Sequence, residues 1–161
     1  MISIFLQIIL TWIYGHILEY IIHRLILHKI GAKKGRILSF HFYGHHSISR
    51  LNNFFDKSYT GFPVRFDPAG KELLSLLFLS IIHIPVALHF PWAGVVVILS
   101  LIRYYYVHRK AHSDPSWAKA NLVWHYDHHM GLNQNKNFGV RSDIIDRVVG
   151  TRVRYYHEQE V

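Results

Sequence analysis

The chain has 161 residues, the size of one domain, so we treat residues 1–161 as a single unit. It contains no cysteine, which excludes disulfides, iron–sulfur clusters and thiolate-bound metals, so any metal must be bound by nitrogen or oxygen. Half of the residues are hydrophobic and the net charge is +8. The apolar residues form blocks flanked by basic residues, which is typical of an integral membrane protein and argues against a nucleic-acid-binding one.

The first apolar block, residues 1–22, has no charged side chain before Glu19. As a helix it would be roughly 33 Å long, enough to cross the hydrocarbon core of a bilayer. A secretory signal peptide is the alternative interpretation, but the block lacks a basic amino-terminal region and a small-residue cleavage site. We therefore expect a transmembrane helix that the protein retains.

The second apolar block, residues 73–107, is interrupted by the sequence HFPW at 89–92. Pro91 disfavours a helical conformation of the preceding residue, so the block predicts a helical hairpin, and Pro85 predicts a kink in its first arm. Pro68 is expected just before the start of that arm. Each arm has only about 16 residues, short of the ~20 of a standard span, which leaves open whether the hairpin crosses fully.

All lysine and arginine residues lie in residues 24–71 or 103–154. By the positive-inside rule both segments face the cytoplasm, whereas the amino terminus and the 89–92 turn lie outside. The sequence therefore predicts an all-α integral membrane helical bundle with its histidine-rich regions at the cytoplasmic face. The polar tail, residues 152–161, is expected to be loosely held.

Ten of the 14 histidines fall into four short clusters. In chain order, the members are His23 and His28; His41, His45 and His46; His108 and His112; and His125, His128 and His129. Residues three or four apart share a face of an α-helix, so such pairs are expected to bind a common metal. They are His41 with His45, His108 with His112, and His125 with His128 or His129. His23 and His28, five apart, lie about 140° around a regular helix, which suits a helix end or two different metals.

The number of histidines indicates a metal site, because ten imidazoles without a partner would be costly to bury near an apolar bundle. Ten exceed what one ion can use, whereas two ions with four or five ligands each would use them all. Imidazole suits zinc, copper, iron and nickel alike. A structural zinc takes four ligands in a closed shell, so this larger set favours a redox or catalytic centre.

Carboxylates contribute little to the motifs. Glu19 lies four residues before His23, and we expect it to orient that imidazole, although it could simply end the membrane helix. Asp127 should point away from the neighbouring histidines and is expected at the surface or behind the metal ligands. Asp143, Asp146 and Arg147 are expected to cap or pair near the last cluster. Asn137 and Gly139 are expected to turn the chain, with lining of the site as the alternative.

The four clusters resemble those of the membrane di-metal fatty acid hydroxylase and sterol desaturase superfamily. The matching segments are LEYIIHRLILH (18–28), HFYGHH (41–46), YYYVHRKAH (104–112) and HYDHH (125–129). NFGVRSDIIDRVVGT (137–151) extends the likeness without contributing a histidine. The resemblance implies two iron ions held by all ten clustered histidines, with zinc as a possible substitute in a purified sample, and dioxygen as co-substrate. The spacing in the first cluster is most similar to fatty acid 2-hydroxylases, which implies a fatty acyl chain as substrate.

The sequence departs from that family in two ways. Three residues separate His41 from His45, where acyl hydroxylases commonly have two. One membrane helix is predicted before the first cluster, where the family usually has more. There is no fused haem-binding cytochrome b5 domain, so a separate donor of the cytochrome b5 or ferredoxin type is expected, docked on the basic cytoplasmic face. We expect a bacterial inner membrane rather than the endoplasmic reticulum. Desaturation, a sterol or carotenoid substrate, and a non-enzymatic histidine-rich metal-binding protein remain the alternatives. A haem protein would leave eight histidines unexplained.

Overall fold

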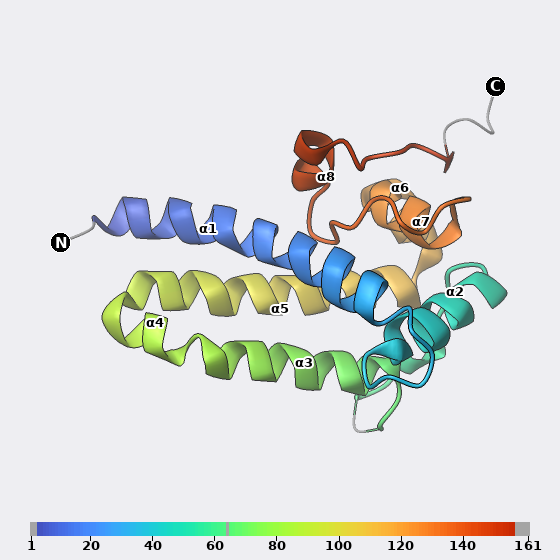
Figure 1. The fold of residues 1–161 in the computed structure, drawn as a ribbon, viewed down its shortest axis with the longest axis horizontal. Coiled ribbons are helices and arrows are strands. Elements are labelled where there is room, and N and C mark those ends of the chain that lie inside the picture. The colour runs from blue at the N-terminus through green and yellow to red at the C-terminus, as the bar shows by residue number, and fades with distance from the viewer. Residues whose placement is uncertain (1–2, 64, 157–161) are drawn as a thin grey trace.

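The computed structural model describes residues 3–63 and 65–156. Within these ranges the chain forms helices and loops and no strand, as expected of an all-α protein. Three rods lie side by side in Figure 1. They are α1 (Ile4–Ile21) with its continuation η1 (Ile22–Ile30), α3 (Pro68–Ile82) with α4 (Ile84–His89), and α5 (Pro91–Ser113). The start of α1 and the α4–α5 turn lie at the same end of these rods, an arrangement that the predicted topology requires.

The first rod is the one described helix that is long and apolar enough to cross a membrane, judged by length and composition. It begins at Ser3, whose side chain accepts a hydrogen bond from the backbone N–H of Leu6 and so caps the helix. Its apolar side chains are largely exposed, Phe5 for example to 73%. Such a surface suits lipid better than water. The helical segment extends to Ile30, eight residues beyond the predicted block.

The predicted hairpin is confirmed, with longer arms than the apolar residues alone indicate. Asp67 caps α3 by accepting a hydrogen bond from the backbone N–H of Gly70, and Pro68 is the first helical residue. The first arm breaks at His83, two residues before Pro85. The turn is tight because Gly94 lies against Ala87, where an added Cβ would be only 2.5 Å from the alanine Cβ. That the hairpin crosses a bilayer stays a prediction.

Short elements gather at the other end of the rods (Figure 1). They are η2 (Phe40–His46), α2 (Ser47–Leu51), η3 (Lys57–Tyr59), α6 (Pro115–Asn121) and α7 (Val123–Met130), whereas α8 (Ile144–Val149) packs along α1. A small apolar core, formed by Phe54, Ala111, Ala118 and Leu122, joins α5, α6 and α7 to the loop after α2. Phe54 has a positive φ of 77° and stacks on the ring of His112 at 4.4 Å. This core therefore packs directly behind a histidine cluster.

The segment after Gly150 is held more firmly than predicted. Arg152 forms a buried ion pair with Asp127 at 2.9 Å, and the other oxygen of Asp127 accepts hydrogen bonds from the backbone N–H groups of Tyr155 and Tyr156. Asp127 is only 1% exposed, so its predicted place at the surface is wrong. A buried carboxylate needs such partners, and here the tail provides them. Residues 157–161 of the predicted loose tail lie outside the described residues.

The loop between α7 and α8 is built around Asp146, which is fully buried. Its carboxylate accepts hydrogen bonds from the backbone N–H of Phe138 at 2.8 Å, the N–H of Gly139 at 2.6 Å and the hydroxyl of Thr151 at 2.7 Å. Asn137 turns the chain with a φ of 60°. The expected structural role of Asp146 and the expected turn at Asn137 are both confirmed.

Candidate metal centre

The structure brings all ten clustered histidines to one place at the α2 and α7 end of the rods. They come from η1, η2, α5 and α7, and each is at most 5% exposed. Nine of them form two groups in which the possible ligand nitrogens lie within 4.8 Å of one another. The first group is His23, His28, His41, His46 and His128, and the second is His45, His108, His112 and His129.

In the five-histidine group the Nε2 atoms converge around His46. The Nε2 of His46 lies 3.1 Å from that of His28, 3.2 Å from that of His41 and 3.2 Å from that of His128. The Nε2 atoms of His23 and His41 are 3.0 Å apart. Neighbouring ligands at right angles on a metal with bonds of about 2.1 Å are separated by about 3.0 Å. The spacing of these nitrogens therefore fits a shared cation.

The four-histidine group contains buried nitrogens that lack a hydrogen-bond partner among the described residues. They are Nε2 of His45, Nε2 of His108 and both ring nitrogens of His129. Burying polar atoms without partners is costly, whereas a cation between these rings would satisfy one nitrogen of each. His125 lies outside both groups, but its Nε2 is 3.2 Å from that of His112 and so faces the second group.

The local backbone explains why the grouping of His23 with His28, and of His41 apart from His45, differs from what a regular α-helix predicts. His23 and His28 share one group because η1 is a π-helix, whose hydrogen bonds join residues five apart and bring them onto one face. Their ring centroids are 5.0 Å apart. The same geometry in η2 places His41 with His46, so His45 falls into the second group instead of sharing an ion with His41.

The fourth cluster also divides in a way that its spacing did not decide. Of its three members, only His128 belongs to the five-histidine group and only His129 to the four-histidine group. His125 had been expected to share an ion with one of them, and it stands instead beside the second group. The expected pairing of His108 with His112 agrees with the structure, which places both in that group.

Acceptors behind the imidazoles fix their tautomers. Nδ1 of His23 lies 2.5 Å from the carbonyl oxygen of Phe138, and Nδ1 of His128 lies 2.6 Å from that of Lys136. A carbonyl oxygen only accepts, so each Nδ1 must carry the proton and donate it. Each Nε2 is then left with a free lone pair directed into the group, which is the arrangement that metal-binding histidines use.

Two carboxylates that the sequence motifs missed have the same function in the second group. Glu72 accepts a hydrogen bond from Nδ1 of His108 at 2.7 Å, and Asp56 accepts one from Nδ1 of His45 at 3.2 Å. Tyr59 donates a further hydrogen bond to Glu72 at 2.5 Å. Neither carboxylate belongs to a histidine cluster, and no spacing in the sequence connects Glu72 with His108, 36 residues away.

Glu19 does not hold His23 in the way that its helical spacing predicted. Its carboxylate forms a buried ion pair with Arg141 at 2.5 Å and accepts hydrogen bonds from the backbone N–H groups of Val140 and Arg141. It therefore fixes the loop that carries Phe138, and the carbonyl of that residue orients His23. The guanidinium and the two N–H groups offer stronger partners for a carboxylate than a neutral imidazole does.

Burial favours the neutral form of several of the clustered imidazoles. It lowers the pKa of His41, His46, His125, His128 and His129 well below 6.5, and positive charge on neighbouring histidines would lower each pKa further. Burial also lowers the pKa of His45, although its hydrogen bond to Asp56 partly opposes this shift. Neutral imidazole is the form that binds metals, so the site is prepared for cations at neutral pH.

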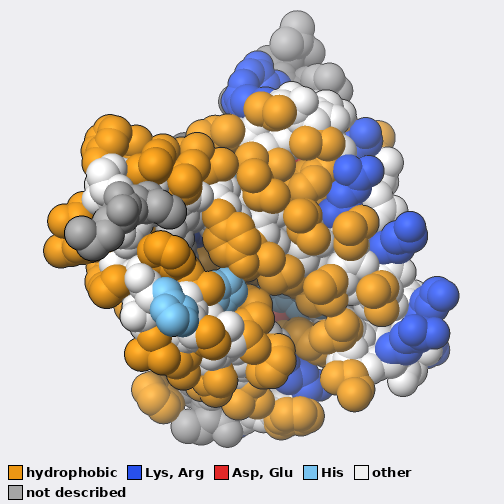
Figure 2. All heavy atoms as spheres, turned by 60° about the vertical axis from the view of Figure 1, so that its left-hand side comes forward, with side chains coloured by type: hydrophobic (Ala, Val, Ile, Leu, Met, Phe, Trp, Pro, Cys, Tyr) orange, Lys and Arg blue, Asp and Glu red, His pale blue; other side chains and the backbone are white. Residues whose placement is uncertain are grey.

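A cavity of about 120 Å³ ends at the metal-binding groups. Its walls come from α1, α3 and α5, and its lining includes His23, His41 and His45 together with apolar side chains. Figure 2 shows that hydrophobic side chains dominate one face of the molecule and surround a hollow in which a histidine and an acidic side chain are visible. A long apolar molecule could therefore reach the histidines from this face.

We expect Glu72→Gln to weaken metal binding about 10- to 100-fold at the four-histidine group, because Nδ1 of His108 would lose its charged acceptor. Competitive titration with a chelator would measure this affinity. Asp67→Asn, at the N-cap of the same helix, preserves a capping side chain and should leave both affinities unchanged. Equal affinities in wild type and Glu72→Gln would show that the carboxylate does not tune the site.

No curated protein and no solved structure matches the chain. The family model described as fatty acid hydroxylase matches residues 8–151, which is most of the chain and includes all ten clustered histidines. This match agrees with the buried histidine groups. The chain therefore belongs to the fatty acid hydroxylase family.

Proposed function

We propose that the protein is an oxygen-dependent lipid hydroxylase that inserts oxygen into an aliphatic C–H bond of a fatty acyl chain. The observation that carries this proposal is the meeting of an apolar cavity with two groups of buried imidazoles. The five-histidine group would hold one iron ion. The four-histidine group, with His125 beside it, would hold the second. Zinc could replace iron in a purified sample because it accepts the same nitrogen ligands.

Iron bound there would supply, with dioxygen, the oxidant that an aliphatic C–H bond requires, since acid–base side chains cannot break such a bond. The chain itself orients the ligands and keeps water out of the cavity. Backbone carbonyls and the carboxylates of Glu72 and Asp56 aim the Nε2 lone pairs at the two groups. Leucine and isoleucine side chains along the cavity exclude water and position the substrate beside His23, His41 and His45.

The exposed apolar surface of the rods supports a place in a membrane, with α1 as a span and the hairpin beside it. The positive-inside rule would place the histidine groups at the cytoplasmic face, of a bacterial inner membrane in our proposal. The substrate would then enter sideways from the bilayer. The basic side chains of that face would dock a separate acidic electron donor of the cytochrome b5 or ferredoxin type.

Desaturation and the hydroxylation of sterols or carotenoids need the same metal groups and the same apolar cavity, so they remain alternatives within the family. A non-enzymatic metal-binding protein is the alternative from another class. Such a protein would have no use for an apolar cavity that leads from the surface of the rods to the ligands. The cavity therefore favours an enzyme.

The proposal is tested by supplying ¹⁸O₂ to the iron-loaded protein with an electron donor in lipid vesicles, followed by mass spectrometry of the lipids. We expect one ¹⁸O atom in an acyl product and none with His46→Ala. Loss of two hydrogens without gain of ¹⁸O would show a desaturase. Lipids unchanged in wild type, with two iron ions bound and the donor oxidised, would contradict the proposal.

A further inference from the structure

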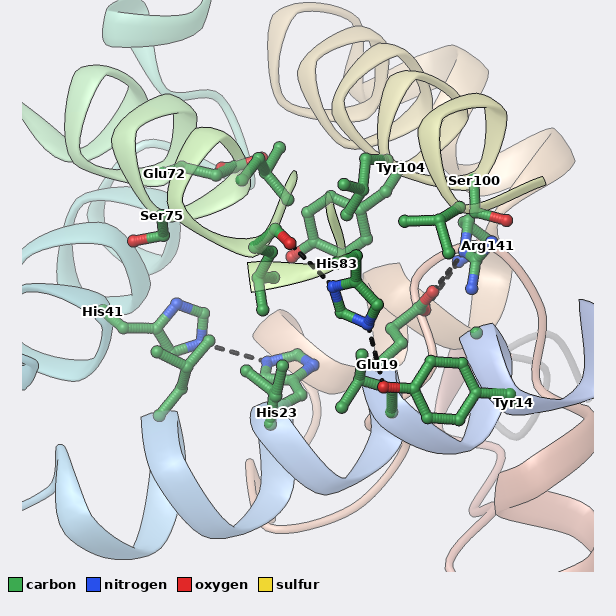
Figure 3. Close-up of a pocket in the computed structure, with 18 of the residues that line it drawn as sticks. Tyr14, Glu19, His23, His41, Glu72, Ser75, His83, Ser100, Tyr104 and Arg141 are labelled. Atoms are coloured by element: carbon green, nitrogen blue, oxygen red, sulfur yellow. Dashed lines mark hydrogen bonds and ion pairs between the residues drawn. The ribbon is translucent and has the colours of Figure 1, made fainter. Parts of the chain in front are cut away.

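The cavity contains a polar pair far from the histidine groups, formed by Tyr14 of α1 and His83 at the break between α3 and α4. The phenol oxygen lies 2.9 Å from Nε2 of His83. Figure 3 shows the hydroxyl of Tyr14 directed at the ring of His83, and His23 and His41 line the same cavity. Neither residue belongs to a histidine group, so the pair has no evident role in holding a metal.

The position of this pair is unexpected in a cavity for an unmodified apolar chain. The cavity surface is mainly apolar, with Leu18, Ile22, Leu76, Leu79 and Leu101 in its walls. The other polar side chains in the lining, apart from those at the metal-binding end, include the Glu19–Arg141 ion pair, Ser75, Ser100 and Tyr104. His83 itself is only 8% exposed. Polar side chains at the level of lipid chains are costly and commonly mark a binding function.

The hydrogen bonds of the pair decide what it can bind. Nδ1 of His83 lies 2.7 Å from the carbonyl oxygen of Leu79, so it donates there. In a neutral imidazole the other nitrogen, Nε2, then accepts, and the hydroxyl of Tyr14 must donate to it. The proton of Tyr14 is thereby used, and its oxygen is left with lone pairs. The pair therefore presents an acceptor to the cavity, which suits a ligand hydroxyl and does not suit a carbonyl.

The helices also define the distance between the pair and the metal-binding end. Tyr14 precedes His23 by nine residues on the first rod, which corresponds to about 14 Å at 1.5 Å per residue. Glu72, the acceptor for His108, precedes His83 by eleven residues on α3 and α4, or about 16 Å. A ligand that spans both ends must therefore be elongated, with its oxygen at the end remote from the oxidised carbon.

We propose that Tyr14 and His83 form a subsite for the hydroxyl group of an elongated lipid alcohol, whose other end lies beside the histidine groups. This inference rests on the proposed function in taking the cavity as the substrate site, and it refines that function by favouring a lipid that carries a hydroxyl group over an unmodified fatty acyl chain. Tyr14 is 44% exposed, so the subsite lies where the cavity opens. In the hydrocarbon of a bilayer a hydroxyl has few partners, so an acceptor at this opening selects lipids that carry one.

The test measures binding alone and needs no turnover. Metal-loaded protein in lipid nanodiscs would be given tritiated cholestanol, and the label would be competed with unlabelled cholestanol, cholestan-3-one or cholestane. A second arm would compare 1-octadecanol with octadecane, so that sterol and acyclic alcohols are distinguished. In whichever arm binds, we expect the alcohol to compete roughly three- to tenfold better than the ketone or hydrocarbon, the value of one hydrogen bond.

Variants of the pair make the test specific. Tyr14→Phe combined with His83→Leu should remove the preference for the alcohol while both metals stay bound. His83→Leu alone frees the hydroxyl proton of Tyr14, so the ketone should then compete as well as the alcohol. Tyr106→Phe is a matched control, because Tyr106 is exposed on α5 and does not line the cavity.

An alcohol preference that persists in the double variant would overturn the proposal, as would equal competition by alcohol and hydrocarbon in wild type in both arms. Failure of the proposed function itself would be recognised differently. In that case no ¹⁸O would enter any lipid, whereas the binding preference and its response to the two substitutions would still be measured.

Discussion

His128→Ala is expected to lower the metal content from two ions per chain to one or fewer and to reduce oxygen-dependent turnover by more than about 100-fold. The substitution removes one of five converging nitrogens, 3.2 Å from Nε2 of His46. Changes to residues that merely orient a ligand already cost 10- to 100-fold, so removal of a ligand should cost more. Metal analysis of the purified protein and the ¹⁸O₂ assay would measure the two effects.

The matched control for this substitution is His89→Ala. His89 ends α4 at the opposite end of the rods and is exposed, so the variant should keep both ions and full turnover. If His128→Ala kept two tightly bound ions and wild-type turnover, the assignment of the five-histidine group would be wrong. A loss of metal in both variants would point to instability of the protein in general.

Asp146→Ala is expected to destabilise the protein by about 3 kcal/mol or more, because it leaves three buried donors without their acceptor at about 1–3 kcal/mol each. Those donors are the backbone N–H groups of Phe138 and Gly139 and the hydroxyl of Thr151. For a protein of this size the melting temperature should fall by roughly 6–12 °C. Thermal unfolding in detergent, followed by tryptophan fluorescence, would measure the change.

Asp114→Ala serves as the control for this second substitution. Asp114 caps α6 by accepting a hydrogen bond from the backbone N–H of Trp117, and its side chain is 39% exposed. Loss of such a cap costs typically about 1 kcal/mol, so the melting temperature should fall much less. Equal effects of the two substitutions would mean that the loop around Asp146 is not a special source of stability.

Much of the architecture could be predicted from the sequence, because apolar blocks and prolines are local signals. The break before Pro85, the turn before Pro91 and the start of α3 at Pro68 all lie where the residues indicate. The gathering of the histidines was predictable from their number. Their division between two groups was not, because a pattern analysis assumes 3.6 residues per turn, whereas η1 and η2 are π-helices.

Contacts between residues that are distant in the chain could not be predicted from the sequence either. The contact of Glu72 with His108 spans 36 residues, and that of Glu19 with Arg141 spans 122. Helical spacing connects Glu19 with His23, whereas its partners Val140 and Arg141 lie in a loop that reaches Glu19 only in the folded chain. For Asp127 the sequence leaves open a place at the surface or behind the metal ligands, because its buried partner Arg152 comes from a segment without any pattern.

Two pairs of consecutive residues supply both histidine groups. His45 and His46 diverge to different groups, as do His128 and His129, and the rings of His46 and His129 stack at 4.1 Å. Consecutive Cα atoms are held about 3.8 Å apart by covalent geometry, so the backbone at each of these pairs positions one ligand of each group at once. A change of the backbone at either pair would therefore disturb both groups, and the loss of a ligand from one group is expected to weaken metal binding at the other as well.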